Sequence, residues 1–181
     1  MSRMLAIVAF GVLLSSPAAA QAPRKDLQVF NDVAREVNRY SRFTVFDDVS
    51  VSVDNGAVTL AGKVTMPYKA RDLERVVSRV AGVVSVDNRL TVLPVSFFDD
   101  ELRYRISRAI YGNPGFWHYA AMANPPIHIV VENGRVTLTG VVSSNVERMM
   151  AQSLASSFNA FAVVNRLKTD AEAQADLERF D

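Results

Sequence analysis

Apolar residues recur at even spacing in two pairs of short runs, and a turn containing Asn-Gly joins the runs of each pair. The turns contain Asn55 and Asn133, each followed by glycine. Period-two alternation is typical of a strand with one buried face, and Asn-Gly tolerates the positive φ angles of a tight hairpin turn. Residues 53–62 (VDNGAVTLAG) and 131–140 (VENGRVTLTG) are identical at seven of ten positions. The pattern therefore predicts the same β-hairpin twice.

Helical spacing of apolar residues replaces this alternation before and after each hairpin. In the first copy, the helix after the hairpin is expected to follow Pro67 and to stop at Gly82. In the second copy, the corresponding stripe is expected to face the core, and it consists of Val146, Met149, Met150, Leu154 and Phe158. A third alternating run closes each copy. Asn88 and Asn165 lie on its inward face, where we expect each to have a structural role, a hydrogen bond to a turn or a bulge.

The order of elements in each copy is therefore α-β-β-α-β. We predict an α+β protein of two tandem two-layer sandwiches, each a three-stranded mixed sheet with two helices on one face. The first domain is expected to span residues 26–95 and the second residues 97–169. Units of about 70 residues are near the lower size limit for independent folding, so we also expect contact between the copies. The acidic tail, residues 170–181, is either a short docked helix or a frayed end.

Residues 1–20 have the features of a secretory signal peptide. Arg3 supplies a positive charge, an apolar run extends from Leu5 to Leu14, and a small-residue cleavage site ends at Ala20. The run is too short to cross about 30 Å of hydrocarbon. The chain contains no cysteine, which excludes a lipid-modified N-terminal cysteine and disulfide bonds. We therefore expect a periplasmic protein.

The repeated pattern resembles a known family. The order α-β-β-α-β, the hairpin signature V-x-N-G-x-V-T-L-x-G, the following helix and the closing V-x-N-x-L are similar to the BON domain, named for bacterial OsmY and nodulation proteins. Both copies match, and Gly62 and Gly140 correspond to the most characteristic glycine of the family. The resemblance implies a non-enzymatic cell-envelope module that binds phospholipid membranes or envelope partners and is linked to osmotic stress. It supplies no catalytic residues.

Charge and motif content exclude several classes of function. Without Arg3 the chain carries 19 basic and 19 acidic residues, unlike the basic surface of a nucleic-acid-binding protein. The sequence has no phosphate-binding glycine loop, catalytic serine motif or zinc-protease motif. The two histidines, His118 and His128, are not at a spacing typical of metal ligands. We therefore expect no enzymatic activity, no cofactor, no metal and no small-molecule substrate.

Two rows of arginines are expected on the outward faces of the first domain's helices. Arg71, Arg75 and Arg79 occur at every fourth residue, and Arg35 and Arg39 have the same spacing on the preceding helix. Guanidinium groups in such rows can bind the phosphates of anionic lipids. The alternative is an ordinary solvated face on which nearby acidic residues pair with the arginines.

The second copy has an aromatic insertion between its first helix and its hairpin. The insertion extends from Gly112 to Pro126 and includes Phe116, Trp117 and Tyr119. Aromatic rings of this kind favour membrane interfaces and the centres of protein interfaces. The alternative is that the rings cover a helix end or fill the joint between the domains.

These observations favour a periplasmic protein that binds anionic phospholipid surfaces through the arginine rows of one copy and the aromatic loop of the other. The alternative is a protein-interaction or chaperone-like module that binds an envelope protein and no lipid. Lipid binding through exposed charges would weaken with salt. Protein binding would depend on the aromatic loop.

Overall fold

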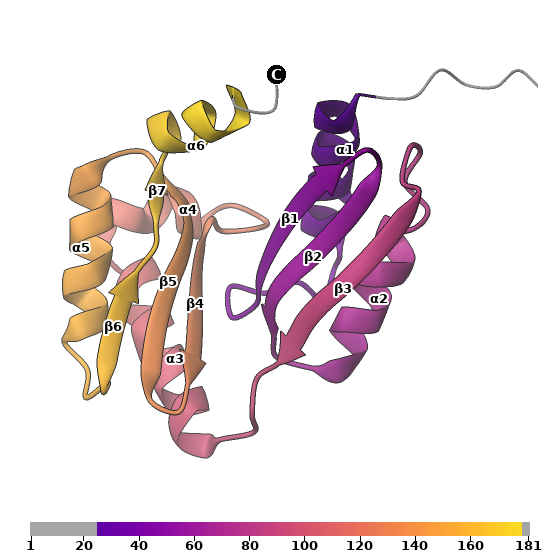
Figure 1. The fold of residues 1–181 in the computed structure, drawn as a ribbon. Helices are drawn as coiled ribbons and strands as arrows, with labels where there is room; N and C mark the ends of the chain where they lie inside the picture. The colour runs from indigo at the N-terminus through magenta and orange to yellow at the C-terminus, as the bar shows by residue number, and fades with distance from the viewer. Residues whose placement is uncertain (1–24, 179–181) are drawn as a thin grey trace, which may run out of the picture.

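The computed structural model describes residues 25–178, and the signal peptide expected at residues 1–20 lies outside this range (Figure 1). Two domains follow one another along the chain, with their main helices and strands in the same order. Domain 1 consists of α1 (Asp26–Arg39), β1 (Asp48–Asp54), β2 (Ala57–Val64), α2 (Pro67–Val77) and β3 (Ser85–Val92). Domain 2 consists of α3 (Phe97–Tyr111), η1 (Pro114–Phe116), α4 (Trp117–Ala120), β4 (Ile127–Glu132), β5 (Arg135–Val142), α5 (Asn145–Ser156), β6 (Ala162–Asn165), β7 (Lys168–Thr169) and α6 (Asp170–Leu177).

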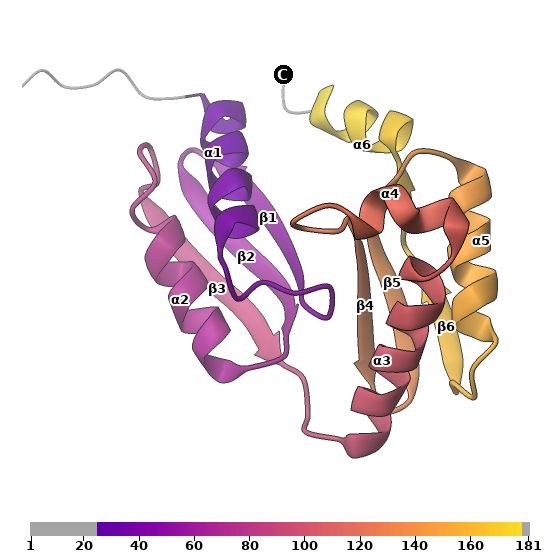
Figure 2. The ribbon, with the colours of Figure 1, turned by 180° about the vertical axis from the view of Figure 1, so that it is seen from behind.

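Each domain is a mixed sheet with two main helices on one face (Figures 1 and 2). β1 is antiparallel to β2, and β3 is parallel to β2. β4, β5 and β6 repeat this arrangement. The last strand of domain 2 is interrupted after Asn165, and its continuation β7 pairs with β5 in an unchanged register. The predicted α+β class and the two tandem sandwiches are confirmed, although the second sheet has four strand segments instead of three.

An aspartate at the start of the first helix of each domain holds the hairpin turn. The Asp26 carboxylate accepts hydrogen bonds from the N–H groups of Asn55 (2.7 Å) and Gly56 (2.9 Å). Asp99 accepts the two corresponding N–H groups in domain 2, both at 2.8 Å. The turn asparagines have φ angles of 49° and 51°, as a two-residue hairpin turn requires. The two residues of each turn lie outside the strand ladder, so their N–H groups have no partner within it. The repeated Asn-Gly therefore ties a helix to a strand pair in both domains.

The glycine that follows each hairpin signature is required by a close backbone approach. A Cβ atom at Gly62 would lie 2.2 Å from the carbonyl oxygen of Asp48, and one at Gly140 would lie 1.8 Å from that of Pro126. Both glycines also have positive φ angles. Any other residue would displace the neighbouring strand.

The prediction that the apolar stripe of α5 faces the core is wrong for the first three residues of the stripe. Val146 and Met149 are 69% and 63% exposed, and Met150 is also exposed. The buried residues of α5 are instead Ala151 and Ala155. Because alanine side chains are small, α5 packs closely through them, and the large apolar residues beside them turn outward. In α2 the expected stripe does face the core, with Leu73 and Val77 fully buried.

Asn88 and Asn165 have the structural role expected of them, but their amides bond to a helix and not to a turn or a bulge. Each side-chain amide donates to a carbonyl of the second helix of its domain, that of Ala70 at 3.0 Å and that of Arg148 at 2.8 Å. Each side-chain oxygen also accepts the N–H of the residue two positions later. These asparagines therefore join the last strand to the helix above it.

A buried polar group anchors the loop before β1. Lys69 donates to Asp47 at 2.6 Å, and this ion pair is almost completely buried, with 5% and 0% of the two side chains exposed. Asp47 also accepts hydrogen bonds from Thr44 and Thr65. The group joins the loop to the end of β2 and to α2. In domain 2, Tyr119 occupies the equivalent place and donates to Glu147 at 2.8 Å.

The two domains are in contact, as expected, and the loop of residues 41–47 forms much of the interface. The N–H of Ile129 on β4 donates to the carbonyl of Val45 at 2.6 Å. The ring of Phe43 lies 5.2 Å from that of His128, and Phe46 packs against the core of domain 2. The domains are therefore joined by backbone pairing and by apolar contact.

The acidic tail contains a docked helix, α6, which resolves the two alternatives left by the sequence for residues 170–177. Thr169 and Glu172 form a capping box at its start. Glu172 pairs with Arg148 at 2.9 Å, and Asp176 pairs with Lys168 at 2.7 Å. These contacts hold α6 against domain 2.

Replacing Lys69 with methionine should destabilise the protein by about 3–5 kcal/mol, because Asp47 would remain buried without its cation. Urea unfolding of the Lys69→Met variant would measure the loss. The control is Lys63→Met, because Lys63 pairs with Glu132 while about a third of each side chain is exposed. The control should lose about 1 kcal/mol or less. Equal losses in the two variants would contradict this account of the anchor.

The stability of domain 1 should depend on acid through Asp47. Burial alone would raise the pKa of Asp47, but hydrogen bonds from Lys69, Thr65 and Thr44 outweigh burial and lower it below the usual 3.8. A carboxyl with a lowered pKa stabilises the folded state above its unfolded pKa, and this contribution is lost as pH falls through the folded pKa. The unfolding free energy should therefore fall below about pH 4. The Asp47→Asn variant should lack this part of the pH dependence.

Candidate functional site

The predicted arginine rows lie on the outer surface of the helical layer of domain 1. Arg71, Arg75 and Arg79 are all exposed on α2 and the turn that follows it. Arg35 and Arg39 are exposed on α1, which packs beside α2. The side of the molecule presented in Figure 2 carries both helices. The structure therefore places both rows in one layer, which we call the arginine face.

An acidic residue between the helices joins the two rows. Asp72 lies 3.2 Å from Arg75 of its own helix and 3.9 Å from Arg42, which follows α1. Tyr40 donates a hydrogen bond to the same carboxylate at 2.9 Å. Burial, this hydrogen bond and the charge of Asp72 raise the pKa of Tyr40 to about 12. Asp72 therefore holds two guanidinium groups and a neutral phenol together at the seam of α1 and α2.

The arginines differ in how far neighbouring acids neutralise them. Arg35 pairs with Asp32 at 2.9 Å, and Arg39 pairs with Glu36 at 3.2 Å. These are exposed pairs within one helix, and such pairs contribute little energy. Arg71 and Arg79 make no ion pair with any residue in the described part of the chain. The charge available to a partner is therefore greatest along α2.

The aromatic insertion does not form one exposed patch, so that expectation is corrected. Phe116 is fully buried in the core of domain 2, and Tyr119 is 6% exposed. Tyr119 donates to Glu147 and accepts the N–H of Ser143 at 2.8 Å, so its hydroxyl group is also held inside the domain. These two rings close the end of the domain 2 core. Only Trp117 presents its ring to solvent, with 61% exposed.

An exposed apolar row on α5 lies beside the segment that carries this tryptophan. Val146, Met149 and Met150 form the row. The segment that contains η1 and α4 lies against α5, because a Cβ atom at Gly115 would be 3.2 Å from the Met150 sulfur. The row was missed because its spacing is the same as that of a buried stripe. We call Trp117 and these three residues the apolar rim of domain 2.

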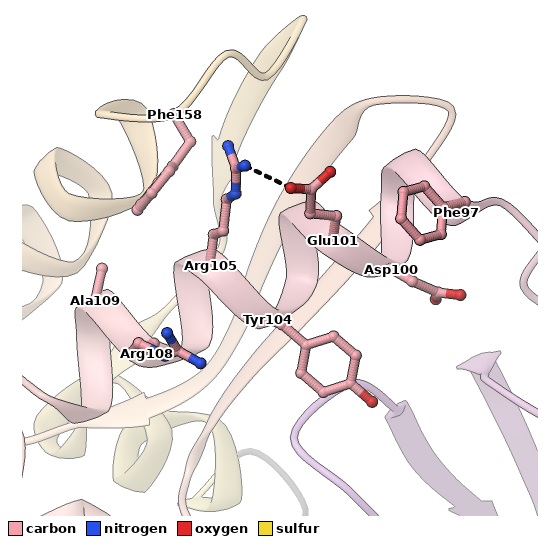
Figure 3. Close-up of a pocket in the computed structure, with 8 residues that line it drawn as sticks. All are labelled: Phe97, Asp100, Glu101, Tyr104, Arg105, Arg108, Ala109 and Phe158. Atoms are coloured by element: carbon pink, nitrogen blue, oxygen red, sulfur yellow. Dashed lines mark hydrogen bonds and ion pairs between the residues drawn. The ribbon is translucent and has the colours of Figure 1, made fainter.

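A hollow of about 610 Å³ lies along the outer side of α3 (Figure 3). Phe97, Tyr104 and Phe158 supply aromatic surface, and Phe97 is 85% exposed. Arg105 points toward Glu101 and pairs with it (Figure 3). The acidic and basic residues that line the hollow are equal in number. This face therefore has aromatic character without a preference for one sign of charge.

A groove of about 1060 Å³ lies between the domains. α1 and the edge of β1 form one wall, the helix-free face of domain 2 forms the other, and α6 borders the groove. Most of the surface in the groove is apolar. Its lining includes none of the arginines of the arginine face, so it constitutes a separate candidate site.

The histidines of the described part of the chain do not belong to a metal-binding cluster. Among residues 25–178, no group of three or more His, Asp or Glu side chains could hold a metal ion. His118 lies 3.9 Å from Glu147, and His128 contacts Phe43. No helix in the same range is long and apolar enough to cross a membrane.

Comparison with known proteins identifies a family match for both domains. The sequence model of the BON domain matches residues 28–94 and 99–171. A solved structure of CdsD, a structural protein of the type III secretion system of Chlamydia trachomatis, is 16% identical over 83% of this chain and 97% of that chain, with a TM-score of 0.29. A structure of the C-terminal domain of CdsD is 14% identical over 75% and 96%, with a TM-score of 0.27. No curated protein matches the sequence.

The burial of Phe116 and the exposure of Trp117 predict effects of very different size for two neighbouring aromatic residues. Phe116→Ala should lower the free energy of unfolding by about 3–5 kcal/mol, because it leaves a cavity in the core of domain 2. Trp117→Ala should change it by about 0.5 kcal/mol or less, because the side chain is at the surface. Chemical denaturation of both variants measures the difference. A loss of stability in Trp117→Ala as large as that in Phe116→Ala would contradict the assignment of Trp117 to the surface.

Proposed function

Because this chain belongs to the BON domain family, which is linked to membrane or envelope association, we propose that it is a non-enzymatic periplasmic protein that binds anionic phospholipid surfaces. The observation that carries the proposal is the arginine face of domain 1. It presents Arg71 and Arg79 without acidic partners among the described residues, beside Arg35, Arg39 and Arg75, whose exposed pairs are weak.

Binding would begin with electrostatic attraction. A basic side chain near an anionic membrane contributes about 1 kcal/mol. A guanidinium group can exchange an exposed carboxylate partner for a lipid phosphate, with which it makes paired hydrogen bonds. The exposed pairs of Arg35, Arg39 and Arg75 therefore do not prevent these residues from contributing. Salt should weaken the interaction, because exposed charges are screened over about 8 Å at physiological ionic strength.

The apolar rim of domain 2 would supply the second contact. Trp117 is the single tryptophan of the chain, and indole rings favour the boundary between lipid and water. α1, α2 and α4 lie on the same side of the two sheets (Figure 2). One membrane plane can therefore meet the arginine face and the turn that carries Trp117. Two linked contacts bind more tightly than either alone when both reach one surface.

The physiological setting is part of the proposal. Periplasmic location rests on the signal peptide expected at residues 1–20. A role in osmotic or envelope stress rests on the family resemblance. Binding without turnover is supported by the character of the family, which is not known as enzymatic.

The proposal predicts that the loss of two arginines will weaken binding to anionic vesicles. Co-sedimentation of residues 21–181 with anionic and zwitterionic vesicles, across a salt series, measures the affinity. Arg71→Gln/Arg79→Gln should bind anionic vesicles about tenfold or more weakly, since each residue contributes about 1 kcal/mol. Wild-type binding should be selective for anionic lipid and should fall as salt increases.

The matched control removes the same charge elsewhere. Arg89→Gln/Arg135→Gln alters two exposed arginines on strands, away from the arginine face, and should change the affinity by about twofold or less. Trp117→Ala should weaken binding without changing its salt dependence. If no vesicle pellets the protein, or if the control loses as much affinity as the α2 variant, the membrane proposal is contradicted. The protein-interaction alternative would then be favoured.

A further inference from the structure

The two domains differ in the hydrogen bonding of the outer edge of their first strand. In an antiparallel pair, a residue directs its N–H and C=O to one side, and its neighbours direct theirs to the other. The N–H of Val141 donates to the carbonyl of Pro126 at 3.3 Å, so even-numbered residues of β4 face β5. The N–H and C=O groups of odd-numbered residues of β4 therefore point to the outer edge, away from β5. β1 pairs with β2 in the same register, so the N–H and C=O groups of Val49 and Val51 also point to the outer edge, away from β2.

The outer edge of β4 is closed by hydrogen bonds. The Tyr111 hydroxyl group both accepts the N–H of Ile127 and donates to its carbonyl. The carbonyl of Val45 accepts the N–H of Ile129, and Arg103 donates to the carbonyl of Val131. The strand edge of domain 2 is therefore unavailable to another chain.

The outer edge of β1 is not closed in this way. The clamps of Asp26 and Asp99 align α1 with α3, so that Phe30 occupies the place of Arg103 and Asn38 that of Tyr111. Within residues 25–178, no side chain or loop makes a hydrogen bond to the outward groups of Val49 or Val51. Exposed strand edges of this kind are sites at which another chain can pair.

This open edge lies on the groove between the domains, and the groove suits an extended chain. Its lining is mostly apolar, and the residues that contribute from domain 1 include Phe30, Ala34, Val37, Phe43, Val49 and Val51. Four charged residues also line it. Asp176 pairs with Lys168, and Asp48 accepts a hydrogen bond from Thr139. Asp48 keeps its negative charge, so the charges of the groove sum to zero. Arg166 is exposed and makes no ion pair with a described residue, so it is the cation in the groove that can bind an anionic group.

We infer that the groove binds an extended peptide of alternating apolar residues, which pairs with the outward edge of β1 and places a carboxylate near Arg166. Main-chain hydrogen bonds to Val49 and Val51 give affinity, and the apolar walls receive alternate side chains. About five residues of strand would extend about 17 Å along the edge. This site is independent of the arginine face, and it gives the protein a second kind of partner.

The test uses the peptide acetyl-Thr-Val-Thr-Val-Thr-Val-Glu, with a free C-terminal carboxylate, and ¹⁵N NMR spectra of residues 21–181. We expect saturable shifts at the amides of Val49, Val51 and the groove, with new protection of these amides from exchange. The same peptide methylated on alternate backbone nitrogens should bind about tenfold or more weakly, because it cannot complete the strand ladder. Arg166→Gln should weaken binding severalfold at low salt.

Two protein variants separate strand pairing from side-chain contact. Val51→Pro removes an outward N–H, which an edge strand tolerates, and should abolish binding. Val51→Thr keeps the N–H and should bind normally, and both variants should still sediment with anionic vesicles. Retained binding in Val51→Pro, equal binding of the methylated peptide, or the absence of shifts at millimolar peptide would overturn the inference. The inference would also be overturned if the amide shifts in the groove appeared only with a submicellar fatty acid, or only on self-association of the protein.

Discussion

In each domain the first strand lies at an edge of the sheet, and its outer N–H and C=O groups have no partner strand. The arrangement of the two domains depends on which groups make hydrogen bonds to this edge. In domain 2 the edge of β4 is closed, and one of the closing groups, the carbonyl of Val45, comes from domain 1. Closure of that edge therefore also joins the domains. The loop that carries Val45 is held by the buried pair of Asp47 and Lys69, so a charge pair inside domain 1 supports the interface.

The features shared by the two copies explain the fold, and the features that differ explain the proposed functions. Both copies use an aspartate clamp, a close-approach glycine and an asparagine that joins the last strand to a helix. Only domain 1 carries a row of exposed arginines on its second helix, and only domain 2 presents an exposed tryptophan beside an apolar row. The same fold, used twice, thus carries an arginine face on domain 1, an apolar rim on domain 2 and an open strand edge in the groove between the domains.

The hairpins, the order of elements and the role of Asn88 and Asn165 could be predicted because each rests on a local pattern that occurs twice. The orientation of α5 could not, because the spacing of Val146, Met149 and Met150 also fits a buried stripe. Only the packing of two small alanines against the sheet distinguishes the alternatives. Likewise, Phe116, Trp117 and Tyr119 lie within four residues of the insertion but have different environments, since Phe116 completes a core formed by distant segments. An open edge is a property of tertiary structure, and no local pattern reports it.

The central claim is that one side of the molecule, formed by α1, α2 and the turn at Trp117, meets an anionic membrane. Amide relaxation of the protein bound to anionic nanodiscs that contain a gadolinium-labelled lipid tests this most directly, because broadening reports distance from the bilayer residue by residue. The account predicts strong broadening for residues 71–79 and near Trp117, with little broadening on β2 and β5. Broadening centred on the strands, or none at lipid concentrations that saturate binding, would contradict it.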